Sequence, residues 1–373
     1  MEKIYARQPI ITKGKSTCGV LSFSDRRWQA APMRDQALSD VLKVWLYAAA
    51  SVMLGAWASP LLYNAGKALS EVSSVKQTNG PVEWLADLCR AAAFPRFFEA
   101  SILLAAVVLF IPFVEWLHGG RAADGSAKRP WHLRLPSGAR KLEVGQRLVK
   151  NDSAVRHVLR GFLVVTVLFL LIGGVLMIAG IFEWRSPAEG YLKLLLRTSV
   201  IALGMAALQE VLFRGIALGI FLRAMRPAAA LAVSAVFFAL VHFLKPPLGL
   251  NVADPDASGI GFELLGKILS EFSDPRMLLG NFVPLLALGG VLAFARWRTA
   301  SLWLPIGLHS GWIFVNGIMA AVTVASTQPN SMMWVIAGAS LRQGLVPLGG
   351  ILLAGVLIDY LTSTDSHAPE SAT

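Results

Sequence analysis

Charge is scarce in this sequence, because only 15% of the 373 residues are Asp, Glu, Lys or Arg, whereas 55% are hydrophobic. A soluble globular domain carries about 25% charged residues. Cysteine is scarcer still: Cys18 and Cys89 are the only two, in different polar segments, with no Cys or His at metal-ligand spacing. This pattern excludes a disulfide framework and a zinc knuckle and favours free thiols. Together these shortages exclude a soluble globular protein and indicate a polytopic membrane protein.

Other absences narrow the class further. The first 41 residues are polar and basic and contain no apolar h-region, so we expect no cleavable signal peptide. The sequence shows no internal repeat and no soluble domain with a core of its own. The formal charge of +11 does not indicate nucleic acid, because Lys and Arg of membrane proteins gather in cytoplasmic loops and meet anionic lipid there. The expected surroundings are therefore a lipid bilayer, without a nucleic-acid partner.

Long apolar runs predict an all-α fold with about eight transmembrane helices, since each span needs about 20 mostly apolar residues. The eight segments are Val44–Tyr63, Phe97–Leu117, Gly161–Phe182, Leu192–Phe221, Ala228–Leu244, Phe282–Ala295, Ser301–Val324 and Leu341–Tyr360. The sixth is short, and Gly344 and Pro347 interrupt the eighth. We divide the chain into a polar N-terminal segment (1–43), N-terminal spans (44–185), a core (190–325), and a last span with a polar tail (326–373).

The distribution of basic residues predicts the orientation. Residues 1–43 carry eight Lys and Arg, and residues 118–157 carry nine, whereas the turn near 325–331 has none. This alternation predicts that both termini lie in the cytoplasm, as in a bacterial inner-membrane protein, with 118–157 as a basic cytoplasmic loop. Residues 64–96 fit less well, because they contain four basic residues.

The connection 245–281 contains apolar residues at helical spacing. They are Phe262, Leu265, Ile268, Leu269 and Phe272. Such spacing predicts a short amphipathic helix that lies in the membrane interface.

The stretch LQEVLFRG, residues 208 to 215, places Gln209, Glu210 and Arg214 inside an apolar run. A charged side chain at bilayer depth costs at least about 2.5 kcal/mol, so such residues usually pair or face a cavity. Glu210 and Arg214 are four residues apart and share a helix face. Taken alone, they fit a structural ion pair. His242 and His309 also lie in apolar spans, and the combined set supplies the base and the donors that hydrolysis needs.

These residues resemble the motifs of the CPBP family, which groups CAAX proteases with bacteriocin-processing enzymes and is also called the Abi family. Its members are intramembrane endopeptidases with the motifs Glu-Glu-x-x-x-Arg, Phe-x-x-x-His, and His-x-x-x-Asn or Asp. In this chain the motifs read Gln209-Glu210-Val-Leu-Phe-Arg214, Phe238-Ala-Leu-Val-His242 and His309-Ser-Gly-Trp-Ile313. The likeness covers about residues 190–325 and implies proteolysis of a protein or peptide substrate near its C-terminus.

The resemblance also implies a role for each position. Gln209 and His242 correspond to the pair that activates water, and His309 and Ile313 to the pair that stabilises the oxyanion. Glu210 and Arg214 correspond to supporting residues. Both metal-dependent and glutamate-dependent mechanisms have been proposed for the family, and Glu210, His242 and His309 could supply three zinc ligands. The sequence contains no HExxH motif.

Two departures from the motifs leave the activity open. Gln209 cannot accept a proton as a carboxylate does, and Ile313 cannot donate a hydrogen bond. Asn316 lies seven residues after His309, on nearly the same helix face, and is a candidate replacement for the missing donor. For Gln209 the alternatives are that Glu210 serves as the base, that the protein binds without cutting, or that a Glu→Gln change was introduced deliberately.

Two rival functions therefore stay open: a non-catalytic immunity or scaffold protein, and a transporter whose buried polar groups mark a permeation path. One geometric conflict also remains. Counting along the predicted spans places His242 near the outer end of its helix and His309 near the inner end of its own, at different depths.

Overall fold

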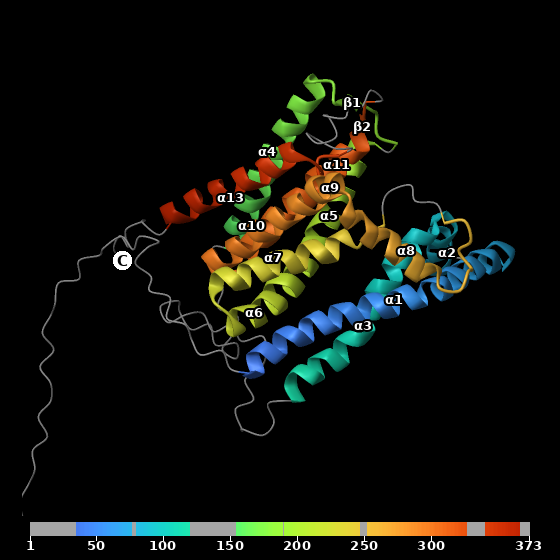
Figure 1. Cartoon of the computed structure of the whole chain (residues 1–373). Helices are drawn as coiled ribbons and strands as arrows, with labels where there is room; N and C mark the ends of the chain where they lie inside the picture. Colours follow the sequence, from blue (N-terminus) through green and yellow to red (C-terminus); the bar gives the residue numbers. More distant parts are fainter. Residues whose placement is uncertain are drawn as a thin grey trace, which may run out of the picture. The chain divides into compact units, whose positions relative to one another are not determined.

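A computed structural model describes residues 35–76, 80–119, 154–188, 190–246, 252–326 and 340–365. Helices dominate these ranges (Figure 1). The elements in chain order are α1 (Asp35–Lys76), α2 (Pro81–Ala91), α3 (Phe94–Gly119), α4 (Ala154–Ile178), β1 (Phe182–Trp184), α5 (Tyr191–Glu210), η1 (Val211–Ala217), α6 (Leu218–Ala224), α7 (Pro227–Phe243), α8 (Ile260–Ser270), η2 (Glu271–Ser273), α9 (Pro275–Met277), η3 (Leu278–Phe282), α10 (Val283–Thr299), α11 (Trp303–Val322), β2 (Thr323–Ala325) and α13 (Leu345–Asp365). The predicted all-α, polytopic membrane fold is confirmed.

Within the described ranges, seven helical stretches are long and apolar enough to cross a membrane. They are Ala37–Lys76, Phe94–Leu117, Ala154–Ile178, Tyr191–Ala224, Pro275–Thr299, Trp303–Val322 and Leu345–Thr362. The remaining predicted span, Ala228–Leu244, forms α7, a shorter apolar helix of 17 residues. At 1.5 Å per residue α7 measures about 26 Å, less than the hydrocarbon core of about 30 Å. The prediction of about eight spans therefore resolves into seven full-length helices and one short one.

Several predicted boundaries were wrong. α1 continues past Tyr63 to Lys76 as one 42-residue helix. The sixth span, which the sequence made look short, becomes a 25-residue stretch once α9 and η3 are added to α10. The last span begins only after Gly344, whose φ of 102° lies in the left-handed region that glycine tolerates. Pro347 then lies in the first turn of α13, where its missing N–H removes no helical hydrogen bond.

A small element was not predicted. β1 and β2 are three-residue strands that pair antiparallel and join the end of α4 to the end of α11. Most of the basic loop 118–157, the segment 326–340 apart from its two ends, and the tail after residue 365 lie outside the described residues. The predictions made for them stay predictions.

The amphipathic helix predicted in 245–281 exists as α8, but its buried face differs from the predicted one. Its buried apolar residues are Ile260, Leu264, Leu265 and Ile268, and they cluster with Ala56 of α1 and with Phe94 and Phe98 of α3. A Cβ on Gly261 would overlap the carbonyl oxygen of Ala56, so the two helices touch at the backbone. Phe262 and Leu269, predicted to share the apolar face, are 38% and 49% exposed. α8 is therefore packed against protein on one side.

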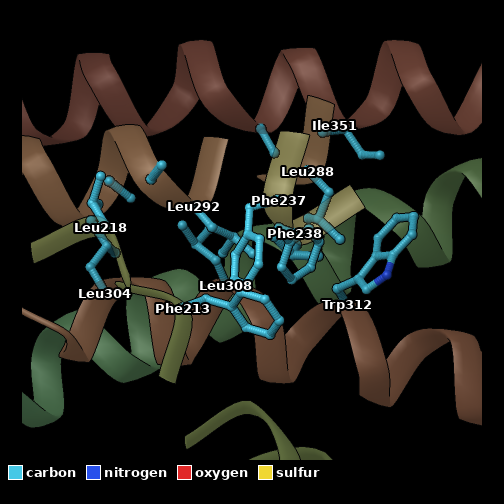
Figure 2. Close-up of a cluster of buried hydrophobic side chains, with 14 of the residues drawn as sticks. Phe213, Leu218, Phe237, Phe238, Leu288, Leu292, Leu304, Leu308, Trp312 and Ile351 are labelled. Atoms are coloured by element: carbon cyan, nitrogen blue, oxygen red, sulfur yellow. The ribbon is translucent and has the colours of Figure 1, made fainter. Parts of the chain in front are cut away.

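A cluster of large apolar side chains joins the helices that carry the predicted motifs (Figure 2). Phe213 comes from η1, Phe238 from α7, Leu292 from α10, and Leu308 and Trp312 from α11. Phe238, Leu292 and Leu308 are 0–1% exposed. Because such a core is close-packed, it fixes the relative positions of the polar side chains that extend from the same helices.

Small residues let α4 and α11 approach each other closely. A Cβ on Gly307 would overlap the carbonyl oxygen of Val158, and one on Gly311 would lie 2.7 Å from the carbonyl oxygen of Phe162. Gly161 of α4 is equally tight against the backbone of Leu308. Gly307 and Gly311 are four residues apart, the spacing that brings membrane helices together. This contact fixes the position of α11 and hence that of His309.

Replacing Gly307 by leucine should therefore destabilise the protein by about 2–3 kcal/mol, because the added side chain forces α4 and α11 apart. The measurement is the free energy of unfolding in mixed detergent and SDS micelles. Gly174→Leu on α4 is the matched control, since no atom lies within 4 Å of a Cβ built there. We expect the control to change stability by less than about 0.5 kcal/mol. Equal losses in the two variants would contradict the close contact.

Candidate active site

The first motif lies where the helix changes type. Gln209 and Glu210 are the last residues of α5, and Arg214 lies in η1, a seven-residue π-helical segment. π-Helical turns insert an extra residue into a helix and occur frequently at functional sites. The sequence predicted one regular helix here and did not reveal the insertion. The π-helical segment belongs to an uninterrupted helical stretch, Tyr191–Ala224, so the motif lies on a locally widened part of one helix.

Three residues form a buried inner group. Glu210 and Arg214 are 0% exposed, and His309 is 3% exposed. Arg214 Nη1 donates to Glu210 Oε1 over 3.0 Å, and His309 Nδ1 donates to the same oxygen over 2.7 Å. One carboxylate oxygen thus accepts from a guanidinium on its own helix and from an imidazole on α11. The inner group joins two motifs that are 99 residues apart.

Arg214 is held from two further sides. Its Nη2 donates to the backbone carbonyl of Gly289 on α10 over 3.1 Å. Its guanidinium carbon lies 4.3 Å from the ring centre of Phe238, within cation–π range. A larger residue than Gly289 would be crowded there, because a Cβ would lie 3.0 Å from the carbonyl oxygen of Ala235 on α7. Sequence reasoning missed the role of Gly289; the only available signal was a Gly-Gly pair inside an apolar run.

Gln209 and His242 form an outer pair, and both are only partly buried. His242 Nδ1 donates to the carbonyl of Phe238, one turn earlier on α7, over 2.8 Å. Its Nε2 lies 3.2 Å from the side-chain oxygen of Gln209. The first-motif position that departs from the family pattern is therefore in direct contact with the second-motif histidine.

The inner group and the outer pair converge. The ring centres of His242 and His309 are 6.4 Å apart, and the ring of Phe238 lies 4.0 Å from the first and 5.7 Å from the second. Residues from α5, η1, α7 and α11 thus meet in one place, and the imidazoles are near enough for a single small group to contact both.

The conflict over depth disappears because α11 begins deep in the structure. A Cβ on Gly215 would lie 3.7 Å from Leu302, the residue before α11. Gly215 precedes the last residue of α6, Ala224, by nine positions (224 − 215), or about 13 Å of helix. The start of α11 therefore lies beside η1, well before the end of α6, and the rings of His309 and His242 come within 6.4 Å of each other. The predicted spans had assumed that all helices begin at the same level.

The structure does not bring Asn316 into the site. Its side-chain amide donates to the carbonyl of Trp312 on the same helix over 2.9 Å, and the described residues give it no contact with either histidine. Ile313, at the family's donor position, packs against the hydrophobic core. The oxyanion role suggested for Asn316 stays a prediction without a supporting contact.

The zinc set suggested for Glu210, His242 and His309 stays a prediction. His242 Nδ1 lies against the carbonyl of Phe238, and its Nε2 lies against Gln209. His309 Nδ1 donates to Glu210, which leaves Nε2 as the ring nitrogen that a metal ion would use. Across the described ranges, no group of three His, Cys, Asp or Glu is placed to hold a metal ion.

A comparison with protein families identifies the same part of the chain. Residues 191–315 match the family model described as Type II CAAX prenyl endopeptidase Rce1-like. The match includes Gln209, Glu210, Arg214, His242 and His309 and ends one residue before Asn316. No curated protein and no solved structure matches the chain.

Proposed function

We propose that this chain, which belongs to the CPBP/CAAX protease family through residues 191–315, is an intramembrane endopeptidase that hydrolyses a peptide bond near the C-terminus of a protein or peptide substrate. The observation that carries the proposal is the meeting of the three motifs at one point among apolar helices. Hydrolysis requires a base near the attacking water and donors near the developing oxyanion. Two imidazoles 6.4 Å apart, a carboxylate and an amide supply the groups for both tasks.

The burial of the inner group supports a reaction that depends on electrostatic stabilisation. Its members are 0–3% exposed and lie among apolar side chains. A low-dielectric site strengthens each charge interaction. One observation favours a non-catalytic relative, namely the amide of Gln209 where the family has a carboxylate.

For the location we propose the bacterial inner membrane, with both termini in the cytoplasm. The turns that join α6 to α7 and α10 to α11 are bordered by basic residues, namely Arg223, Arg226, Arg296 and Arg298. If α7 is counted, the helices make an even number of membrane crossings. The start of α1 and the end of α13 therefore lie on the same side of the membrane as these basic turns. A C-terminal reporter active only outside the cytoplasm should therefore stay silent.

Cleavage by the purified protein tests the function. We expect the protein, reconstituted in liposomes, to release a C-terminal fragment from a membrane-anchored peptide, with the product identified by mass. Replacing His242 by alanine should lower the rate by about 10²-fold or more, because it removes an imidazole that borders the reacting atoms. Solute flux through the liposomes that persists in His242→Ala, without any cleavage product, would instead identify a transporter. Substrate binding without cleavage by either form would identify a non-catalytic relative.

A further inference from the structure

One hydrogen bond fixes where His309 carries its proton. The Nδ1 of His309 lies 2.7 Å from Oε1 of Glu210, which also accepts from Arg214. A carboxylate accepts, so the ring donates from Nδ1, and Nε2 is the ring nitrogen left free within the inner group. An Nε2 atom that carries its lone pair can take a proton from water. A carboxylate that holds an imidazole in this way orients a base, which differs from the oxyanion role that the family resemblance implies for His309.

His242 differs from His309 because both of its ring nitrogens have partners. Its Nδ1 donates to the carbonyl of Phe238, and its Nε2 lies 3.2 Å from the side-chain oxygen of Gln209. A glutamate at position 209 could store a proton taken from water, but an amide cannot. An amide instead has two N–H donors, of which His242 uses at most one. Gln209 therefore keeps an N–H of the kind that serves in oxyanion holes.

We propose that the two pairs have exchanged roles in this chain: His309, held by Glu210, is the base that activates water, and the Gln209 amide binds the oxyanion. The proposal rests on the endopeptidase function above. It requires a carbonyl group and a water to lie between the two pairs. It also explains why the chain keeps Glu210 and Arg214 although the first glutamate is missing: they are the residues that orient the base.

The reaction then proceeds as follows. A lone pair of water forms the new C–O bond at the scissile carbonyl carbon, while a water proton passes to Nε2 of His309. The carbonyl π electrons move to its oxygen, which accepts a hydrogen bond from the Gln209 amide. The oxygen electrons return, the C–N bond breaks, and the imidazolium of His309 gives its proton to the leaving nitrogen. Glu210 stabilises the imidazolium without taking its proton, as in a carboxylate–histidine pair. The products are a new carboxyl terminus and a free amine.

Substitutions at position 209 separate this scheme from the one that the resemblance implies. Gln209→Glu places a carboxylate beside the oxyanion, so we expect kcat to fall by about 10²-fold or more. The implied scheme predicts the reverse, because the variant restores the family's base. Gln209→Met keeps the size of the side chain but removes its N–H groups, and we expect a similar fall in kcat with KM nearly unchanged.

The outcomes are distinguishable. Equal or higher activity of Gln209→Glu, or unchanged activity of Gln209→Met, would overturn the exchanged roles. If the wild-type protein is inactive and Gln209→Glu cleaves, the exchanged roles are also overturned. That result would identify the wild type as a non-catalytic relative. Absence of cleavage in both would instead overturn the endopeptidase function itself. Loss of wild-type activity with a metal chelator and its recovery with zinc would assign His309 to a metal and also overturn the proposal. If Gln209→Glu does not fold, Gln209→Met alone decides.

Discussion

Replacing Arg214 by methionine should destabilise the folded protein by about 3–5 kcal/mol, the largest effect on stability that we expect from any single substitution in the site. Arg214 is fully buried, donates to Glu210 and to the Gly289 carbonyl, and lies over the ring of Phe238. Its removal leaves the carboxylate of Glu210 in an apolar interior with no cation beside it. The free energy of unfolding in mixed micelles, compared with that of the wild type, measures the effect.

A double substitution tests whether the uncompensated charge is the cause. In Arg214→Met combined with Glu210→Gln, neither charge remains, so most of the lost stability should return, to within about 1–2 kcal/mol of the wild type. Cleavage by the double variant should nevertheless be lost, because His309 no longer has the carboxylate that orients it. If the double variant is as unstable as Arg214→Met alone, lost packing rather than the buried charge explains the destabilisation.

The sequence predicted the chemistry of the site better than its geometry. The spacing from Glu210 to Arg214 and from Phe238 to His242 marked residues that the structure brings together, because both spacings are local and follow from helix periodicity. The 99-residue separation between Glu210 and His309 has no such local signal. Only the family resemblance connected the two, and it did not reveal which atoms touch.

What the sequence could not provide depends on how helices start and approach one another. Nothing in an apolar run indicates that α11 begins beside Gly215, so counting residues gave a false difference in depth. The π-helical segment at Val211–Ala217 has the composition of an ordinary helix. Asn316 follows His309 by seven residues on the same helix, but its amide donates to a carbonyl one turn earlier. Such local competition for hydrogen bonds is common in helices and cannot be seen in residue spacing.

The largest loss of activity is expected for His309→Ala, which should lower kcat by about 10³-fold or more, since one side chain both removes the proton from water and returns it to the leaving nitrogen. Stability should fall less than in Arg214→Met, because Glu210 keeps its hydrogen bond to Arg214. The measurements are single-turnover cleavage rates and unfolding free energies of the same preparations. His157→Ala on α4 is the matched control and should cleave like the wild type.

Chemical rescue separates a proton-transfer role from a packing role for His309. Removing the ring leaves a cavity lined by Phe238 and the carboxylate of Glu210, which a free imidazole can enter. Added imidazole should therefore restore part of the cleavage rate of His309→Ala, and a molecule of similar size without a basic nitrogen should restore none. If His309→Ala combined with Glu210→Gln were rescued equally well, Glu210 would not orient the base. Rescue that depends on Glu210 would mean that the carboxylate acts through the imidazole, as their shared hydrogen bond indicates.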